Sequence, residues 1–204
     1  MRILLDFDGT IVDLWQRYYR VFCDINECQN VSLQNYIKIK RQFVRDENVA
    51  KELGIHLKEN YFSDKRKLLE EPKYLNMDVP LITTNKLLEF VSNNPVNILT
   101  CRRNKHKLFL EMKRLGMGEL IDRTIVLNPD DITKKEWIDY YCCCESVIVV
   151  GDGTADFETR KCRNVKVFMV NTGLMKIEEL SDCGVEMIDS IEHFINNFDC
   201  VLKN

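Results

Sequence analysis

The feature that most constrains this chain is residues 2–10, where a short apolar run leads directly into two acidic residues. Residues 3–5 are all apolar, which predicts a buried strand of a parallel sheet. Asp6 and Asp8 stand two positions apart, so both point to the same side of an extended chain, and Gly9 then permits a sharp turn. Two carboxylates at the end of a buried strand are costly unless a cation or a catalytic task accounts for them. The alternative is a surface turn with two solvated acids, because short motifs also occur by chance.

Length and composition exclude several classes of protein. The 204 residues predict one large domain, or a core with a modest insertion, and 45% hydrophobic residues are enough for a sizeable core. A net charge of −3 gives no reason to expect nucleic acid or an anionic membrane as a partner. Every apolar run is shorter than a membrane span, and a strand at the very start predicts that there is no signal peptide. Nine cysteines without paired CxxC spacing predict free thiols, and therefore a cytoplasmic protein.

Residues 14–80 show only helical spacing of apolar residues, so we expect helices and no strand in this segment. After a first helix from residue 14, Ser32 is expected to cap a second helix, which Gly54 ends. A third helix is expected between residues 57 and 72, and residues 79–81 are expected to link back to the core.

From residue 84 onward, apolar runs alternate with helical patterns. Strands are expected at residues 96–100, 124–127, 146–150 and 165–170, with helices between them and a last helix at 191–198. This alternation predicts an α/β fold, a parallel sheet with helices on both faces. The expected division is a core of residues 1–13 and 81–204, with residues 14–80 as a separate helical domain.

Polar side chains follow three of these expected strands at their carboxyl ends. Asp6, Thr100 and Asp152 each come directly after an apolar run. Ligands of open parallel sheets bind at this edge, so we expect the three side chains to share one crevice. The alternative for Thr100 is a hydroxyl group that satisfies the local backbone.

Two basic segments lie close to these strand ends. Arg102 and Arg103 could reach a substrate phosphate or carboxylate, although such residues often lie at a solvated helix start. The sequence T-x-x-E at residues 133–136 predicts a capping box, which puts Lys134 and Lys135 in the first turn of a helix. A cation there opposes the helix dipole unless an anion lies nearby. From this pattern alone, Lys134 and Lys135 are both candidates for such a contact.

Four motifs in this order resemble those of the haloacid dehalogenase-like (HAD) superfamily, in its phosphatase branch. They are DFDGT at residues 6–10, Thr100 after an apolar strand, a lysine at a helix start, and GDGTAD at residues 151–156. The K-x-E-x-apolar pattern from Lys134 to Ile138 is more similar to the family's arrangement, so the resemblance favours Lys134, with Lys135 as the alternative. The resemblance covers about residues 1–12 and 82–190 and implies a Rossmann-like core. Residues 14–80 lie where this family inserts its small helical type-1 cap after the first strand.

The resemblance implies a Mg²⁺-dependent phosphatase that hydrolyses a small phosphorylated metabolite. Asp6 would attack phosphorus to form an aspartyl-phosphate, and Asp8 would protonate the leaving oxygen and then activate water. In this scheme a metal-bound Asp6 stays ionised while Asp8 can hold a proton at neutral pH. Mg²⁺ would be held by Asp6, the Asp8 carbonyl and Asp152, with Asp156 as a ligand or a neighbour of the ligands. The phosphate would be bound by Gly9, Thr10, Thr100, Cys101, Arg102 and Lys134.

Alternative functions remain at this point. A phosphotransferase or phosphomutase on the same scaffold would differ only in the group that accepts the phosphoryl, and a non-catalytic binding protein could keep the fold. The run Cys142-Cys143-Cys144 is interpreted as packing near a helix end, because consecutive residues on a helix chelate a metal poorly. The sequence predicts neither the individual substrate nor the oligomeric state.

Overall fold

A six-stranded parallel sheet forms the centre of the computed structural model, which describes residues 1–43, 45–175 and 183–201. Its order is β5-β4-β1-β6-β7-β8, and every neighbouring pair is parallel. The strands are β1 (Arg2–Leu5), β4 (Val96–Cys101), β5 (Thr124–Leu127), β6 (Val147–Gly151), β7 (Val165–Val170) and β8 (Glu186–Ile188). This is a doubly wound, Rossmann-like order, which reverses direction between β1 and β6.

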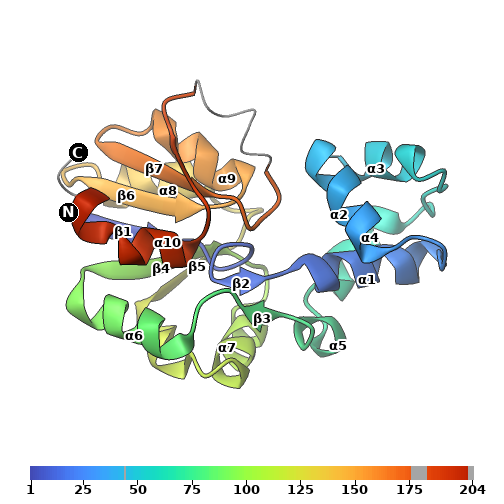
Figure 1. Cartoon of the computed structure of the whole chain (residues 1–204), viewed down its shortest axis with the longest axis horizontal. Helices are drawn as coiled ribbons and strands as arrows, with labels where there is room; N and C mark the ends of the chain where they lie inside the picture. Colours follow the sequence, from blue (N-terminus) through green and yellow to red (C-terminus); the bar gives the residue numbers. More distant parts are fainter. Residues whose placement is uncertain (44, 176–182, 202–204) are drawn as a thin grey trace.

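Helices cover both faces of the sheet and bury its two apolar surfaces (Figure 1). One face packs against α6 (Thr84–Asn93), α7 (Lys105–Arg114), the 3₁₀ helix η1 (Gly118–Arg123), α10 (Ile191–Asn196) and α11 (Phe198–Val201). The other packs against α8 (Lys134–Tyr141), α9 (Thr154–Phe157) and the 3₁₀ helix η2 (Glu158–Lys161). The expected α/β fold with a parallel sheet is therefore confirmed.

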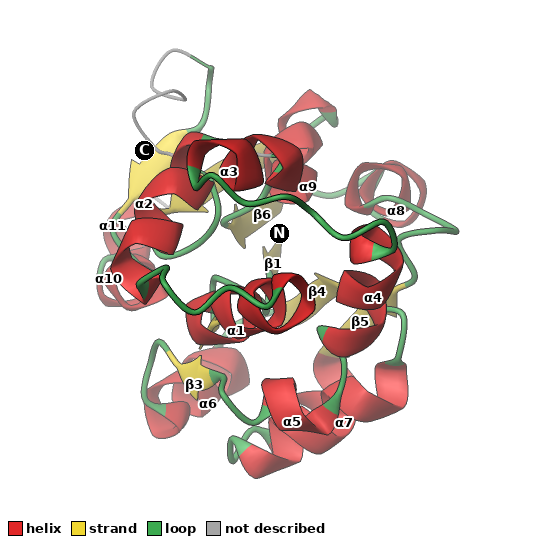
Figure 2. Ribbon diagram, turned by 90° about the vertical axis from the view of Figure 1, so that its right-hand side faces the viewer, coloured by secondary structure: helices red, strands yellow, loops and turns green. Residues whose placement is uncertain are grey.

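A second group of helices lies beside the carboxyl ends of β1 and β6, outside the sheet (Figures 1 and 2). It contains α1 (Trp15–Asn26), α2 (Leu33–Gln42), α3 (Asp46–Glu52), α4 (Tyr61–Leu68) and α5 (Pro72–Leu75). These helices have an apolar cluster of their own, in which Phe22, Tyr36 and Tyr61 are almost fully buried. Two chain segments join this group to the sheet, and they pair as the antiparallel strands β2 (Val12–Asp13) and β3 (Val79–Pro80).

Most expected elements are present, and the differences have local causes. The strands at 124–127 and 165–170 have the expected bounds, and Ser32 caps α2 by accepting from the Asn35 N–H. The helix expected to reach Gly54 is wrong, because the chain becomes extended at Phe43 and a new helix begins at Asp46. The expectation of no strand within residues 14–80 is wrong at β3.

The edge strand β8 was not predicted, since it has only three residues and is largely exposed or half-buried. In the cysteine run, Cys142 packs in the apolar layer beneath α8, whereas Cys143 and Cys144 are exposed. None of the helices in the described ranges has the length and apolar character needed to cross a membrane.

Candidate active site

The candidate site lies where β1 and β6 end side by side. Leu5 pairs with Val150, so Asp6 and Asp152 leave neighbouring strands at the same edge of the sheet. The strand order reverses between these two strands, and such a reversal opens a crevice in which open α/β sheets bind ligands. The topology therefore brings together residues that are far apart in the sequence.

Three buried carboxylates meet one buried lysine in this crevice. Asp6, Asp152 and Asp156 offer oxygens that all lie within 4.8 Å of one another. The Lys134 Nζ lies 2.7 Å from Asp6 Oδ1 and 2.7 Å from Asp156 Oδ1. The capping box of Thr133 and Glu136 is present and starts α8 at Lys134, which fixes the lysine in the first turn. The anions that the sequence required near this lysine are therefore Asp6 and Asp156.

Lys135 lies elsewhere. Its side chain is exposed and pairs with Asp139 on the outer face of α8, at 2.5 Å. The structure thus places Lys134, and not its neighbour, beside Asp6.

The cluster contains more negative than positive charge. Burial raises the pKa of Asp6 well above its ordinary value, and Asp156 adds to this rise while Lys134 opposes it. Burial and Asp156 likewise raise the pKa of Asp152 to about 7. Burial would lower the pKa of Lys134, but Asp156 and Asp6 outweigh it and raise that pKa above its usual value. One additional cation would offset the excess of carboxylates.

The residues present fit a divalent metal of the Mg²⁺ type. Carboxylate oxygens are the ligands that such hard cations prefer, and the cluster supplies them from three side chains. The backbone is also shaped to hold Asp152. A Cβ atom added to Gly9 or to Gly173 would lie 2.3 Å and 1.8 Å, respectively, from Asp152 Oδ2. The carboxylate can take its position only because both residues are glycines.

A loop after β7 also holds this part of the site. The Leu174 N–H donates to Asp152 Oδ2 at 2.9 Å, and the Thr172 hydroxyl donates to the Gly9 carbonyl at 2.6 Å. The indole N–H of Trp15, on α1, donates to the Thr172 carbonyl at 2.9 Å. The loop therefore links the first helix of the second group to the acidic cluster.

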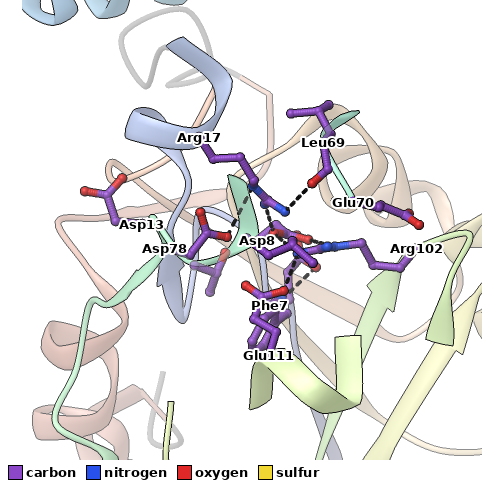
Figure 3. Close-up of polar contacts among 12 residues, drawn as sticks. Phe7, Asp8, Asp13, Arg17, Leu69, Glu70, Asp78, Arg102 and Glu111 are labelled. Atoms are coloured by element: carbon purple, nitrogen blue, oxygen red, sulfur yellow. Dashed lines mark hydrogen bonds and ion pairs between the residues drawn. The ribbon is translucent and has the colours of Figure 1, made fainter. Parts of the chain in front are cut away.

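Asp8 does not join the acidic cluster through its side chain. Arg102 donates to its carboxylate twice, from Nε to Oδ2 and from Nη2 to Oδ1, both at 2.6 Å, and Arg17 donates to Oδ1 as well (Figure 3). Burial alone would raise the pKa of Asp8, but Arg102 and Arg17 together hold it well below the ordinary value. The expectation that Asp8 holds a proton at neutral pH is wrong for this arrangement, because two guanidinium groups stabilise its anion.

Two further buried carboxyl groups lie behind these arginines. Asp78 Oδ2 is 3.2 Å from Arg17 Nε, and Glu111 Oε2 is 3.2 Å from Arg102 Nη2 (Figure 3). Burial raises the pKa of Asp78 to about 9 against the opposing effect of Arg17, and Glu111 adds to the rise. Burial raises the pKa of Glu111 as well, so burial disfavours the charged form of both carboxyl groups behind the arginines.

The remaining predicted phosphate-binding residues occupy different places. Thr10 is buried, and its hydroxyl lies 3.4 Å from Asp152 Oδ1. Thr100 is buried near the end of β4, and its role as a phosphate ligand stays a prediction. Burial raises the pKa of the Cys101 thiol to about 11, and Lys134 and Asp6 are close enough to affect it. Arg103 is partly exposed and pairs with Asp130 rather than with the acidic cluster.

Sequence reasoning missed Arg17, Asp78 and Glu111. A signal existed for two of them. Arg17 stands three residues after Leu14 and four before Val21, and Glu111 stands three after Leu108 and four before Leu115, so each lies on the apolar stripe of its helix. A charged residue on such a stripe predicts a buried ionic contact. Asp78 lies in a loop, and no pattern marks it.

Solved structures that resemble this chain include HAD family hydrolases and a predicted phosphatase. A HAD family hydrolase from Deinococcus radiodurans, whose structure contains bound phosphate and sodium, matches with a TM-score of 0.69 at 12% identity, over 98% of this chain and 94% of that one. A predicted phosphatase from Clostridium acetobutylicum matches with a TM-score of 0.70 at 17% identity, over 100% and 98%. A haloacid dehalogenase-like family hydrolase from Streptococcus pneumoniae matches with a TM-score of 0.67 at 15% identity, over 97% of both chains.

Neither a model of a known protein family nor a curated protein matches the sequence of this chain. The likeness is thus one of fold over nearly the whole length of each structure. The chain has the fold of the HAD hydrolases, as the resemblance of its motifs implied.

Proposed function

We propose that the protein is a Mg²⁺-dependent phosphatase that hydrolyses a small phosphorylated metabolite through an aspartyl-phosphate on Asp6. The observation that carries this proposal is the position of Lys134 between Asp6 and Asp156, with Asp152 beside them, at the strand reversal of a HAD-type fold. The phosphate bound in the similar structure from Deinococcus radiodurans supports it.

Asp6 is oriented for attack by its own contacts. The Phe7 N–H donates to Asp6 Oδ1 at 2.8 Å, and Lys134 contacts the same oxygen at 2.7 Å. These two donors hold one oxygen of the carboxylate and so restrict its orientation. An activated carboxylate of this kind splits a difficult displacement into two easier steps.

Positive charge and positioning supply most of the catalysis in phosphoryl transfer. Lys134 is the positively charged side chain that contacts Asp6. It would therefore lie next to the phosphoryl group of an aspartyl-phosphate on Asp6. A bound Mg²⁺ would be held by Asp6 and Asp152, with the Asp8 carbonyl or Asp156 completing the set, and it would neutralise phosphoryl charge.

Asp8 is the proposed proton carrier, which protonates the leaving oxygen and then activates water. In the structure its carboxylate lies on Arg102 and Arg17, so this role requires it to turn away from both. The chain turns directly after Asp8, at Gly9, which has a φ of 77°.

Residues 14–80 are proposed to act as a cap over the site, with the core made of residues 1–13 and 81–204. Their separate apolar cluster and the contact of Trp15 with the loop at Thr172 support this division. Deletion of the segment is expected to spoil selectivity among phosphate esters. Unchanged selectivity in a folded deletion variant would contradict the cap proposal.

The nine free cysteines are consistent with a reducing, cytoplasmic location, which we propose as well.

The proposed function is tested by release of phosphate from a panel of phosphorylated metabolites, with Mg²⁺ and with EDTA. Turnover is expected only with the metal and not in Asp6→Asn, because an amide is a far weaker nucleophile than a carboxylate. Transfer of the phosphoryl group to an added acceptor alcohol, detected as a new phosphate ester without release of free phosphate, would instead indicate a phosphotransferase. Full activity in Asp6→Asn or in EDTA would refute the assignment.

A further inference from the structure

Two buried arginines lie beside the acidic cluster without belonging to it. Arg17 of α1 is 2% exposed, and Arg102, directly after β4, is 7% exposed. Figure 3 shows both guanidinium groups converging on Asp8. Buried arginines are rare unless paired, so their position calls for an anion at this point.

The arginines are held in place from behind, independently of Asp8. Asp78 contacts Arg17 Nε at 3.2 Å, and the Leu69 carbonyl accepts from Arg17 Nη1 at 3.2 Å. Glu111 contacts Arg102 Nη2 at 3.2 Å. The two guanidinium groups therefore keep their positions when Asp8 turns away, and they form a preorganised anion site.

The geometry of this site is that of a carboxylate receptor. Arg102 binds the two oxygens of Asp8 with two parallel N–H contacts of 2.6 Å each, the fork arrangement that guanidinium and carboxylate groups prefer. Asp8 must leave this position to reach a leaving-group oxygen at Asp6. When Asp8 leaves, the buried guanidinium groups of Arg17 and Arg102 lose an anionic partner. This loss is strongly unfavourable unless another anion takes the place of Asp8.

A small cavity gives such an anion a place to enter. Its volume is about 120 Å³, and its charged lining residues are Asp8, Glu70 and four arginines, Arg17, Arg66, Arg102 and Arg103. Tyr18, Leu69 and Cys101 complete its walls. About 10–15 Å³ of such space is enough to hold one water molecule, so the cavity admits a group larger than a single water. Cys101 also lies close enough to Lys134 and Asp6 for their charges to affect the pKa of its thiol.

We propose that Arg17 and Arg102 bind a carboxylate of the substrate, so that the enzyme acts on short phosphorylated carboxylic acids. The carboxylate of the substrate takes the place of Asp8 on the arginines, and Asp8 turns to the phosphate ester. Asp78 and Glu111 are positioning residues, since they hold the arginines without contacting the substrate. This inference rests on the proposed phosphatase function and names the class of its substrate.

The test compares two substrates that differ at one end. Phosphoglycolate carries a carboxylate, and 2-hydroxyethyl phosphate carries a neutral CH₂OH group in its place. The ratio of their kcat/KM values is measured with Mg²⁺ for the unmodified protein and for Arg17→Met, Arg17→Lys and the control Arg20→Met. Arg20 lies on the same helix but is 50% exposed and pairs with Asp24.

The kcat/KM of the unmodified protein is expected to be about 10- to 100-fold higher for phosphoglycolate, which is the factor that a hydrogen bond to a charged group usually contributes. Arg17→Met is expected to bring the ratio close to one, mainly by raising KM for phosphoglycolate, while Arg20→Met leaves the ratio unchanged. Arg17→Lys keeps the charge but loses the fork, and an intermediate ratio is expected. This variant provides the test if Arg17→Met does not fold.

Other outcomes would overturn the inference in distinguishable ways. Equal turnover of both substrates, abolished in Asp6→Asn, would leave the phosphatase in place and refute the carboxylate site. A preference for phosphoglycolate that persists in both Arg17 variants would refute the assignment of Arg17. If neither these substrates nor acetyl phosphate is hydrolysed in an Asp6-dependent manner, the proposed function itself fails.

Discussion

Replacement of Gly9 by alanine separates two effects that the structure predicts at this position. Gly9 has a φ of 77°, in the left-handed region that side chains disfavour, and an added Cβ would also lie 2.3 Å from Asp152 Oδ2. Gly54 is a matched control, because its φ is 67° and a Cβ there would meet nothing within 4 Å. Both variants share the backbone strain, and only Gly9→Ala disturbs the site.

The magnitudes follow from these contacts. The left-handed conformation costs an alanine about 1–2 kcal/mol. In a chain of this size, each kcal/mol of lost stability lowers Tm by about 2–4 °C. Gly9→Ala adds an overpacking cost of about 1–3 kcal/mol. An ordinary contact begins at 3.4 Å, so the Asp152 carboxylate has to move by about 1 Å. A displacement of that size costs on the order of 100-fold in rate.

The assay combines thermal unfolding with kcat/KM for p-nitrophenyl phosphate and with the Mg²⁺ concentration that gives half-maximal rate. Gly54→Ala is expected to lose stability only. Gly9→Ala is expected to lose more stability, to lose about 100-fold in activity, and to need more Mg²⁺. If both variants lose equal stability and keep full activity, Asp152 has no role in the reaction.

Two further predictions concern the charges of the site. Lys134→Met leaves Asp6 and Asp156 without their shared cation, so we expect a loss of activity and a loss of about 3–5 kcal/mol in the free energy of unfolding. The control Lys135→Met should change activity and stability little. Equal effects of the two variants in urea unfolding and in turnover would contradict this prediction. Because the pKa of Asp152 is raised from 3.8 to about 7, the folded metal-free protein keeps a proton that the unfolded chain has lost between these pH values, and its stability should fall as pH rises through this range. Mg²⁺ displaces that proton, so its affinity, measured by calorimetric titration, should increase from pH 5.5 to about 7 and then level off; an affinity independent of pH would contradict the raised pKa.

The fold and the centre of the site could be predicted because their signals are local. The apolar run before Asp6, the capping box before Lys134 and the acidic turn at Asp152 each lie within a few residues of sequence. The parallel topology then brings them together without further information.

The arrangement around Asp8 could not be predicted, because its partners come from separate elements. Arg17 lies on α1, Asp78 in the loop before β3, and Glu111 on α7, and their contacts depend on how the two groups of helices pack. Spacing alone shows that Arg17 and Glu111 lie on apolar stripes, but it does not show which acid or base each one meets. For the same reason, the resemblance suggested Asp8 as a proton carrier, but nothing in the sequence predicted its contacts with Arg17 and Arg102.

The central claim is that Asp6 carries the phosphoryl group during turnover. The most direct measurement is a brief incubation with acetyl phosphate and Mg²⁺, followed by acid quench, proteolysis and mass spectrometry. We expect a mass increase of one phosphate on the peptide that contains Asp6, and no such increase in Asp6→Asn. Phosphate on a serine, threonine or cysteine, or an unlabelled Asp6 peptide in an enzyme that is turning over, would contradict the account.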